Sequence, residues 1–223
     1  MSEQFPRKLY GRRKGPKQSA HKEELHRTLL PRLALTLISG ADPSAYFGDV
    51  DDVWLEIGFG AGEHLLALAR ANPRVGLIGA EPYQAGVAKL LSHMADDPPA
   101  NLRLHEGDAR QIIEALPDAC LGCVIILFPD PWPKTRHHKR RFIQTEMLDQ
   151  LARIMKPGAE LRFASDDAGY AEWTLERAAA HPSFTWTATG PSDWRIRPPD
   201  WPQTRYEAKA LHGPPVYFSF VRT

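Results

Sequence analysis

The sequence has few cysteines, no long apolar run and almost no net charge. Its 223 residues contain two cysteines and carry a formal net charge of +1, and two cysteines are too few for a disulfide framework. No stretch approaches the ~18 consecutive apolar residues of a membrane span, and the first residues lack the apolar core of a secretory signal. We therefore expect a soluble, cytoplasmic protein with no membrane partner.

The two cysteines, Cys120 and Cys123, are spaced as a C-x-x-C pair. A zinc site needs further ligands, and the adjacent His137 and His138 are poorly spaced to supply them. Cys123 also opens an apolar run that continues to Phe128. The pattern favours buried structural thiols over redox or metal chemistry, and we expect no metal.

Basic residues are concentrated in two blocks, although the chain as a whole is nearly neutral. Residues 1–32 contain nine Lys/Arg and three Glu, and residues 131–145 contain five Lys/Arg and no acid. The rest of the chain is therefore acidic. Two basic blocks on an acidic body suggest an anionic polymer as partner, with nucleic acid as the first candidate. Charge alone is equally compatible with a solvated tail and a solvated loop.

The N-terminal part is expected to be an extension of one main domain. Hydrophobic residues make up 43% of the chain, which supports a sizeable core. Residues 1–20 are basic and rich in Gly, Pro, Ser and Gln, a composition typical of a segment that is mobile in isolation. Leucine spacing predicts a short helix over residues 21–30, which Pro31 ends or kinks. We divide the chain into an extension over residues 1–40 and a main domain over residues 41–223.

Strand-like and helix-like segments alternate through the main domain. Their short connections predict a mostly parallel sheet with helices on both faces, and the last strand, which no helix follows, fits an antiparallel edge. The expected strands are residues 53–57, 75–80, 102–105, 123–128, 160–164 and 216–221, and the expected helices are residues 63–71, 83–95, 109–116, 142–155 and 170–180.

The first strand-to-helix turn is rich in glycine. Gly58, Gly60 and Gly62 follow Glu56 at alternate positions, and glycines at such a turn let the backbone approach a ligand and adopt positive φ. A dinucleotide fingerprint would need Gly or Ala at position 63, which is Glu. The pattern is instead similar to the S-adenosylmethionine loop of Rossmann-like methyltransferases.

Two more acids follow the next two strands. Glu81 ends the second strand, where a carboxylate accepts hydrogen bonds from both hydroxyls of an adenosine ribose. Asp108 follows the third strand, where it would accept from the adenine amino group. Each acid alone is more often a loop or cap residue. Three acids at successive strand ends indicate a cofactor site, because that edge of such sheets binds ligands, and we expect S-adenosyl-L-methionine there.

The most specific stretch follows the fourth expected strand. Asp130 stands between Pro129 and Pro131, which stiffen the chain around it, and Trp132 and a basic run come next. A carboxylate, an aromatic plane and cations together suit a flipped purine on a phosphate backbone.

These residues resemble the bacterial tRNA (guanine-N7)-methyltransferases, which modify guanine 46 in the variable loop of tRNA. The resemblance runs from about Arg12 to the C-terminus. Its markers are Glu-Ile-Gly-Phe-Gly at 56–60, Phe-Pro-Asp-Pro-Trp at 128–132 followed by Lys134, and Thr-Arg-Tyr-Glu at 204–207. The second and third markers are far more specific than the first. The resemblance implies a Rossmann-like class I methyltransferase fold, S-adenosyl-L-methionine as methyl donor and tRNA as partner.

The resemblance also implies roles for individual residues. Asp130 is the expected catalytic residue. The implied cofactor contacts are Glu56, Gly58, Gly60, Gly62, Glu81, Asp108 and Asp130. The implied guanine contacts are Lys134, Asp166, Thr204, Arg205, Tyr206 and Glu207. The implied RNA contacts are Arg136, His137, His138, Lys139, Arg140 and Arg141. The chain departs from the family pattern at Ala61, where a glycine is common, and at Thr135, where a second basic residue is frequent.

The chemistry of guanine N7 sets what these residues have to do. N7 carries a lone pair and no proton, so methyl transfer needs no general base. Asp130 is expected to orient the guanine and to stabilise the positive charge that develops on it. It is also expected to protonate well below pH 6, because Lys134 and Arg136 follow it in sequence. Asp166 and Glu207 would accept from the guanine N1–H and amine, donors that adenine lacks.

Alternatives remain open from the sequence. Asp166 and Asp167 would cap a helix starting near residue 170, and Trp194 and Trp201 would serve either as edge packing or as a platform for a base. An amino methyltransferase acting on adenine or cytosine is the alternative activity, although the Asn/Asp-Pro-Pro-aromatic motif of those enzymes is not matched. A non-catalytic RNA-binding module on the same fold is the alternative of another class.

Overall fold

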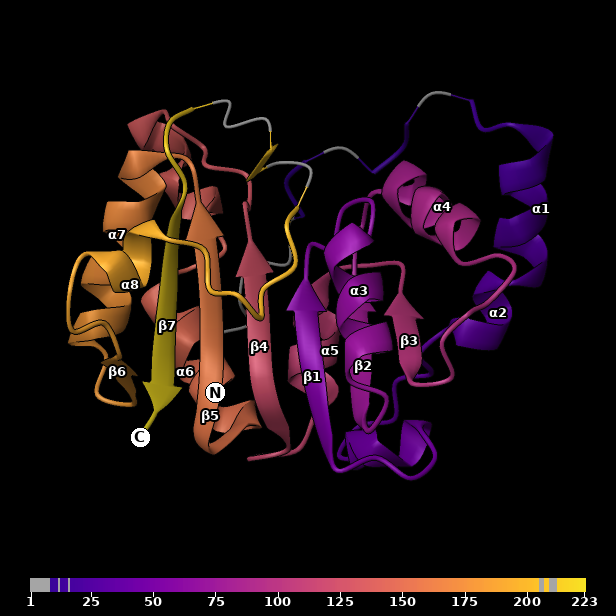
Figure 1. Ribbon diagram of the computed structural model, residues 1–223, viewed down its shortest axis with the longest axis horizontal. Coiled ribbons are helices and arrows are strands. Elements are labelled where there is room, and N and C mark those ends of the chain that lie inside the picture. Colours follow the sequence, from indigo (N-terminus) through magenta and orange to yellow (C-terminus); the bar gives the residue numbers. More distant parts are fainter. Residues whose placement is uncertain (1–8, 12, 16, 205–206, 209–211) are drawn as a thin grey trace.

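The centre of the molecule is a seven-stranded sheet with the strand order β3-β2-β1-β4-β5-β7-β6 (Figure 1). The computed structural model describes residues 9–11, 13–15, 17–204, 207–208 and 212–223. The strands are β1 (Asp52–Ile57), β2 (Val75–Ala80), β3 (Leu102–His105), β4 (Leu121–Leu127), β5 (Met155–Ser165), β6 (Phe184–Trp186) and β7 (Val216–Arg222). β1 to β5 pair in parallel, whereas β7 runs antiparallel to β5 and β6. The predicted parallel sheet with an antiparallel edge is confirmed.

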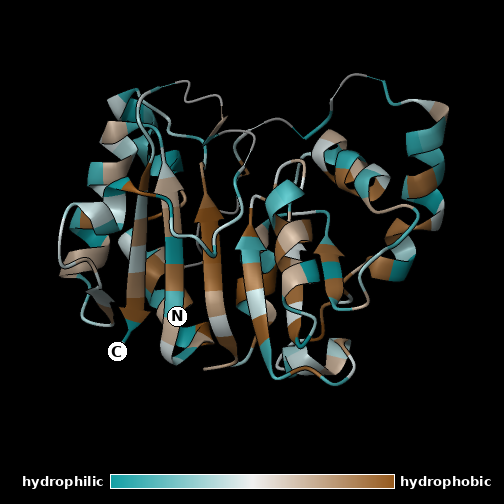
Figure 2. Cartoon of the chain, in the orientation of Figure 1, coloured by the Kyte–Doolittle hydropathy of each residue, from teal (hydrophilic) through white to brown (hydrophobic). Residues whose placement is uncertain are grey.

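Apolar side chains fill the middle of the sheet. Figure 2 shows β4 as hydrophobic along most of its length, and Val124, Ile125 and Ile126 are at most 1% exposed. A strand with both faces buried reads as a continuous apolar run and needs a helical layer on each side. This is why residues 123–128 carry no polar alternation.

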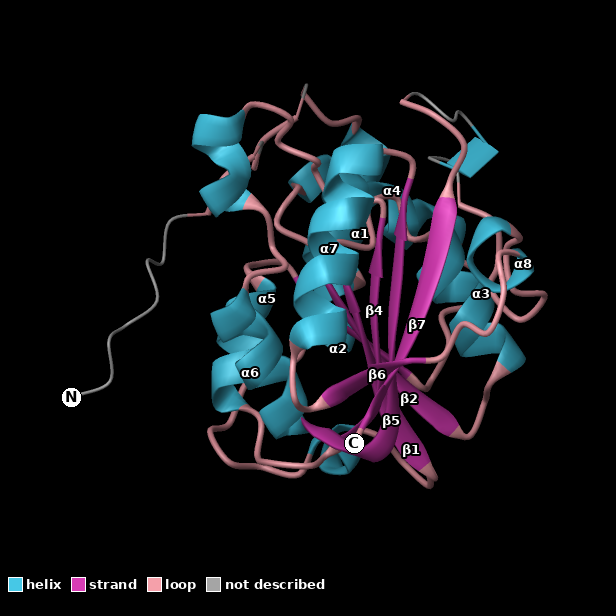
Figure 3. Ribbon diagram, turned by 90° about the vertical axis from the view of Figure 1, so that its left-hand side faces the viewer, coloured by secondary structure: helices cyan, strands magenta, loops and turns pink. Residues whose placement is uncertain are grey.

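Helices provide that cover on both faces (Figure 3). α5, α6 and α7 pack on one face in one core cluster, and α2, α3 and α4 pack on the other face in a second cluster. The helices are α1 (Ala20–Thr28), α2 (Leu30–Leu33), α3 (Glu63–Ala71), α4 (Gln84–His93), α5 (Ala109–Ala115), α6 (Thr145–Ile154), α7 (Ala168–Ala180) and α8 (Ser192–Arg195), with 3-10 helices η1 (Pro43–Tyr46) and η2 (Thr135–Arg140). None of the described helices is long and apolar enough to cross a membrane.

The junction between α6 and β5 differs from the expectation. Lys156, Pro157 and Gly158 were expected to separate a helix from a strand, yet β5 starts at Met155, directly after α6. The pairing of β4 with β5 shifts register here, between Leu121 and the next paired residue. An irregular stretch tolerates a proline without N–H and a glycine with φ of 82°. The breaker residues therefore form a bulge instead of a loop.

The antiparallel edge contains two strands, of which one was expected. β7 lies between β5 and β6, so that the three-residue β6 is the outermost strand. A three-residue segment gives too short a pattern to read from sequence. The four-residue α8 was missed for the same reason.

The N-terminal helices pack against the sheet domain. Leu29 and Leu33 are buried in the same core cluster as α3 and α4. Pro31 breaks the helix as expected: α1 ends before it, and α2 carries it in its first turn, where a missing N–H costs no hydrogen bond. The N–H of Leu35 then donates to the carbonyl of Leu104 at the edge of β3 (2.8 Å). The division of the chain at residue 40 stays a prediction.

The two cysteines are thiols set against the core. Cys123 is buried and Cys120 is half-buried, and both are free. Burial raises the pKa of the Cys120 thiol to about 11, which disfavours the thiolate that redox and metal chemistry require. Within the described residues, no group of three or more His, Cys, Asp or Glu side chains is placed to hold a metal ion.

Arg162 on β5 fixes the loop that follows α8 to the sheet. Its guanidinium pairs with Glu160 (2.7 Å) and Asp200 (3.0 Å). It also lies over the rings of Trp54 and Trp201, at 5.4 and 5.3 Å from their centroids. Trp201 is 3% exposed, so it serves as edge packing and not as a platform for a base.

We expect Arg162→Met to loosen this loop and lower the free energy of unfolding by about 1.5–3 kcal/mol, the range for hydrogen bonds to charged groups. Urea denaturation measures the change. Arg27→Met is the matched control, because Arg27 is 72% exposed in its pair with Glu24 and should contribute less than about 1 kcal/mol. Equal effects of the two substitutions would contradict the role given to Arg162.

Candidate functional site

The carboxyl ends of the parallel strands meet around a cavity of about 1430 Å³. This edge of the sheet is uppermost in Figure 1. Four acids that the sequence singled out line the cavity: Glu56, Glu81, Asp108 and Asp130. Each of them ends or follows a strand, and parallel pairing brings those strand ends to one side.

Glu81 ties the glycine loop to the turn after β2. Its two carboxylate oxygens accept hydrogen bonds from the N–H of Gly60 (2.7 Å) and of Tyr83 (2.8 Å), and the residue is 7% exposed. Each oxygen keeps a second lone pair. Glu81 can therefore hold the loop and still accept from two ligand hydroxyls.

Glu56 is paired with a residue that sequence reasoning missed. Its Oε2 lies 2.8 Å from Nδ1 of His64, in the first turn of α3, and the two residues are 3% and 4% exposed. Nε2 of His64 is buried without a hydrogen-bond partner among the described residues. A single histidine in a helix gives no sequence pattern; the pair forms because the glycine loop folds α3 back over the end of β1.

Asp108 caps α5 and binds Arg110. Its Oδ1 accepts from the backbone N–H of Arg110 (3.0 Å), and its carboxylate accepts from the guanidinium at 2.6–3.0 Å. Asp108 thus has the cap role that the sequence allowed as an alternative. Its predicted contact with adenine would be made beside this guanidinium, since Arg110 also lines the cavity.

The three loop glycines differ in what they contact. All have positive φ, 75° at Gly58, 58° at Gly60 and 77° at Gly62, which glycine adopts without strain. Gly58 and Gly60 line the cavity, and a Cβ on Gly58 would meet open space. A Cβ on Gly62 would lie 2.6 Å from Cδ1 of Leu90 on α4. Gly62 is therefore a packing glycine, and the geometry gives no support to its expected cofactor contact.

Asp130 stands on a strained turn after β4. Phe128 and Trp132 on either side of it have φ of 49° and 46°, a conformation that is costly for bulky side chains. The side chain lies on the cavity wall, and the backbone of Gly11 approaches its carboxylate: a Cβ there would lie 3.6 Å from Asp130 Oδ2. Strain of this kind is kept where the fold needs one side chain in one place.

Desolvation raises the pKa of both Glu81 and Asp130. For Glu81 burial is the main cause; the N–H groups of Tyr83 and Gly60 act in the opposite direction, and the charges of Asp130 and Glu56 raise the pKa further. Lys134 and Arg136 do not lower the pKa of Asp130 as expected, because removal of its carboxyl from water raises that pKa; protonation of Asp130 well below pH 6 stays a prediction.

The side chains of the basic segment around η2 do not share one environment. Lys134, Arg136 and Lys139 are exposed, and Lys139 also lines the cavity. These three remain available to an anionic partner.

Two histidines and an arginine of the same segment pack on aromatic rings. His137 meets Trp132 edge-on at 5.9 Å between centroids, and His138 meets Trp173 at 5.3 Å. The guanidinium of Arg140 lies 4.8 Å from the ring centroids of both Trp132 and Tyr10. In this conformation their rings and cation are used within the protein, and their expected RNA contacts stay a prediction.

Arg141 requires a correction. It was expected on RNA, but it is 4% exposed. Its Nε donates to the carbonyl of Pro131 (2.9 Å) and its guanidinium to the carbonyl of Gly169 (3.0 Å), while the ring of Tyr170 lies 5.0 Å away. A charged side chain this deep binds internal acceptors, so Arg141 joins the strained turn to α7.

The described part of the N-terminal basic block lies across the cavity. Leu9, Tyr10 and Gly11 line it, and the carbonyl of Arg13 accepts from the N–H of Gln84 at the start of α4 (3.0 Å). In Figure 1 the indigo segment runs from α1 over this edge of the sheet. The composition predicted a mobile tail, whereas the described stretch is packed against the domain.

Asp166 and Asp167 contact different parts of the chain. Asp167 caps α7 by accepting from the N–H of Tyr170 at 2.7 Å. Asp166 accepts from the N–H of His212 at 3.1 Å. The capping interpretation is therefore correct for Asp167, and Asp166 joins the start of α7 to the segment before β7.

Thr204 and Glu207 cap each other at the start of a helical turn. Oγ1 of Thr204 accepts from the N–H of Glu207 (3.0 Å), and Oε2 of Glu207 accepts from the N–H of Thr204 (3.4 Å). This is the reciprocal arrangement of a capping box. The spacing of Thr204 and Glu207 fits that motif, but it was not predicted from the sequence. Arg205 and Tyr206 lie outside the described residues.

The expected guanine contacts are only partly gathered at the cavity. Thr204 lines it. Lys134, Asp166 and Glu207 are not among its lining residues, and Oε1 of Glu207 accepts from Arg197 Nε and the Tyr217 hydroxyl at 2.9 Å each. Glu207 is thus held by its own loop in this conformation.

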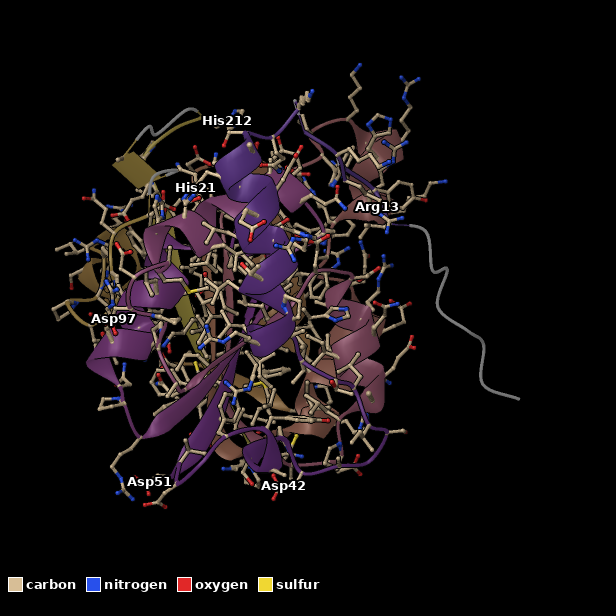
Figure 4. The ribbon with its side chains drawn as sticks, turned by 90° about the vertical axis from the view of Figure 1, so that its right-hand side faces the viewer. Arg13, His21, Asp42, Asp51, Asp97 and His212 are labelled. Atoms are coloured by element: carbon tan, nitrogen blue, oxygen red, sulfur yellow. The ribbon has the colours of Figure 1, made fainter. Side chains whose placement is uncertain are left out.

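Charged residues of both signs lie at both ends of the molecule: four acids line the cavity, and Arg74 pairs with Asp51 at the far end. In Figure 4, Arg13 and His212 lie at the cavity end, whereas Asp42 and Asp51 lie at the far end.

Three observations indicate that S-adenosylmethionine fits the cavity. Gly58 leaves open space beside the loop backbone. Glu81 has lone pairs left for a ribose diol. Buried Glu56 offers a negative charge to an ammonium group, beside a His64 nitrogen that has no hydrogen-bond partner in the described part of the chain.

Comparison with known proteins finds a matching family profile and similar relatives. A family profile described as "Putative methyltransferase" matches residues 51–217. The tRNA (guanine-N(7)-)-methyltransferase of Rhodospirillum rubrum is 52% identical over 96% of this chain and 88% of its own length. That of Caulobacter vibrioides is 47% identical over 97% and 96%, and that of a Chelativorans species is 43% identical over the full length of both.

This chain belongs to the tRNA (guanine-N(7)-)-methyltransferase family.

Solved structures show the same fold at low sequence identity. The 16S rRNA methyltransferase KamB superposes with a TM-score of 0.54 at 16% identity, over 84% of this chain and 96% of that one. The 16S rRNA (adenine(1408)-N(1))-methyltransferase from Catenulisporales acidiphilia gives 0.54 at 15% identity, over 86% and 97%. The methyltransferase described here therefore has the Rossmann-like class I fold, whose members generally take the methyl group from S-adenosylmethionine.

The raised pKa values of Glu81 and Asp130 predict how cofactor binding depends on pH. Both carboxyls are ionised above their raised pKa and become neutral as the pH falls through it. Affinity for S-adenosylmethionine, which carries a sulfonium charge, should be full where both carboxyls are ionised and fall on acidification by at most about tenfold per pH unit for each group that must ionise. S-adenosylhomocysteine, with a neutral sulfur, should lose less affinity. Calorimetry with both ligands, from alkaline pH down through the pH at which the two carboxyls protonate, measures the difference.

Two variants serve as controls for this titration. Asp130→Asn removes one titrating group and should bring the two curves closer together. Asp118→Asn removes a carboxylate that is 77% exposed in a pair with Arg153 and should leave both curves unchanged. Parallel curves for the two ligands in the unaltered protein would contradict the prediction.

Proposed function

We propose that this protein transfers a methyl group from S-adenosyl-L-methionine to N7 of a guanine in tRNA, with guanine 46 as the expected position. The observation that carries the proposal is the cavity that Asp130, on its strained turn, shares with Glu56 and Glu81. It is supported by 52% identity to a curated tRNA (guanine-N(7)-)-methyltransferase.

The acids divide the binding of the cofactor among them. S-adenosylmethionine supplies a methyl group made electrophilic by the sulfonium. Glu81 accepts from the ribose hydroxyls while it holds the glycine loop, and Asp108 together with Arg110 receives the adenine end. Glu56 balances the ammonium charge of the methionine part. Four carboxylates in one cavity favour a cationic ligand over a neutral one.

Asp130 acts on the guanine without taking a proton from it. N7 has no hydrogen, so no residue needs to work as a base. The ionised carboxylate instead orients the base and stabilises the positive charge that forms on its imidazole ring. The turn between Phe128 and Trp132 fixes the carboxylate before the substrate arrives, so little reorganisation is needed during the reaction.

Selection of guanine falls to the loop before β7. Thr204 already lines the cavity and we assign it to the base. Asp166 and Glu207 would accept from N1–H and the exocyclic amine, and each has to share the oxygens that now accept from His212, Arg197 and Tyr217. Adenine has neither donor and offers an acceptor at N1 instead, so carboxylates turned toward the base discriminate against it.

Methylation of unmodified bulk tRNA with labelled S-adenosylmethionine tests the function directly. Nucleoside analysis should place the label in 7-methylguanosine. Label in N6-methyladenosine would assign the chain to the amino methyltransferases. Cofactor and tRNA binding without transfer would assign it to the non-catalytic modules.

Asp130→Asn is the variant to run beside that assay. It keeps the shape of the side chain and removes its charge, so both ligands should still bind. Single-turnover methyl transfer should fall by roughly 10²–10³, as for loss of one preorganised electrostatic group. A variant that transfers at nearly the unaltered rate would reduce Asp130 to a structural role.

The exposed cations predict the salt dependence of tRNA binding. Neutralising Arg136 and Lys139 together should weaken binding and reduce the slope of log K against log salt by roughly 0.7–0.9 for each lost phosphate contact. Filter binding across a salt series measures the slope.

A double variant at the opposite end of the sheet separates local contacts from net charge. Arg70 and Arg74 are 50% and 62% exposed. Arg70 lies in the last turn of α3 and Arg74 directly precedes β2, away from the cavity. Their neutralisation should leave the slope unchanged. If both double variants flatten the slope equally, the block around η2 has no special part in RNA binding.

A further inference from the structure

The proposed mechanism gives Glu56 a task but leaves its buried partner in the cavity wall, His64, without one. Glu56 stands one residue before the end of β1, and His64 lies in the first turn of α3. Their side chains are 4% and 3% exposed, and Nδ1 is 2.8 Å from Oε2. Both residues line the cavity. The other large buried side chains of α3 are leucines, so packing alone does not explain a buried histidine in this helix.

The loop between the two residues cannot hold Glu56 by itself. Its glycines, at 58, 60 and 62, contribute backbone and no side chains, and the N–H of Gly60 is already bonded to Glu81. Among the described residues, His64 is the partner recorded for the Glu56 carboxylate. An ionised carboxylate only accepts hydrogen bonds, so Nδ1 must carry the hydrogen. The imidazole therefore sets the orientation of the carboxylate.

The two buried glutamates of the cavity are used differently. Both oxygens of Glu81 are bonded to backbone N–H groups. In Glu56, Oε2 is bonded to His64, whereas no hydrogen bond to Oε1 is recorded among the described residues. One oxygen of a buried, oriented carboxylate is thus left for a donor that the described residues do not supply. A buried charge of this kind needs a partner of opposite sign.

We propose that His64 is a positioning residue for the methionine end of the cofactor: its Nδ1–H fixes Oε2 of Glu56, so that Oε1 accepts from the cofactor's ammonium group. The inference rests on the proposed function, because it takes S-adenosylmethionine as the ligand. It assigns His64 to one end of the ligand only. The adenosine end is bound through Glu81 and Asp108, which do not contact His64.

Two ligands that differ only at that end separate positioning from general support. S-adenosylhomocysteine carries the amino-acid group, and 5′-methylthioadenosine lacks it. His64→Leu should lower the affinity for S-adenosylhomocysteine by roughly tenfold or more, as for a lost hydrogen bond at a charged group. The affinity for 5′-methylthioadenosine should stay within about twofold, which also shows that the variant is folded. Calorimetry of the full chain gives both values without any turnover.

Two further variants complete the design. His64→Asn places an amide N–H near the position of Nδ1 and should restore most of the lost affinity. His181→Asn is the matched control, because His181 is 6% exposed and its Nε2 lies 3.1 Å from a carboxylate oxygen of Asp149, between α6 and the end of α7. It should change neither affinity.

The outcomes that overturn the inference are distinct from failure of the proposed function. Equal loss of both ligands in His64→Leu, with no rescue by His64→Asn, would make His64 a support of the whole pocket. An unchanged affinity for S-adenosylhomocysteine would remove it from the site. If the unaltered protein binds neither ligand, the proposed function itself fails, and the inference with it.

Discussion

The carboxylate of Glu81 is the contact on which the geometry of the cavity depends. It joins the N–H of Gly60 to the N–H of Tyr83, and so fixes the loop after β1 to the turn after β2. The carbonyl of Gly60 in turn lies so close to Gly86 of α4 that a Cβ there would be 2.3 Å from it. Loop, strand ends and α4 are therefore positioned together. Because the bond is buried, it also places a negative charge where water offers little stabilisation.

The interior of the cavity and its surroundings meet opposite electrostatic demands. Inside, the charges of Asp130 and Glu56 raise the pKa of Glu81, so the acids destabilise one another until a cation arrives. Outside, Lys134, Arg136 and Lys139 are exposed. A cationic cofactor would reduce the repulsion among the acids, and a polyanion would pair with the exposed cations. The near-zero net charge of the chain hides this division, which appears once the strand ends and the basic segment are placed in space.

The sequence predicted those features that depend on chain-local patterns. The apolar run of β4, the bounds of β2, β3 and α3, and the convergence of four acids all follow from strand spacing and parallel topology. It did not predict His64, whose partner is eight residues away across a folded loop. Nor did it predict the three-residue β6, which is too short for a periodic pattern. The acids were found because topology alone brings strand ends together, whereas side-chain pairs depend on how each loop folds.

Arg141 shows why a run of like charges cannot be assigned to one role. A guanidinium has five donors in a fixed plane, and here two carbonyls, of Pro131 and Gly169, use them while aromatic rings of Tyr170 and Trp173 cover its faces. A lysine could not bridge both carbonyls in that way. The residue thus fastens the strained turn of Asp130 to α7 at the very point where the exposed cations end. The exposed basic segment and the strained turn that carries Asp130 are consequently one continuous, anchored piece of chain.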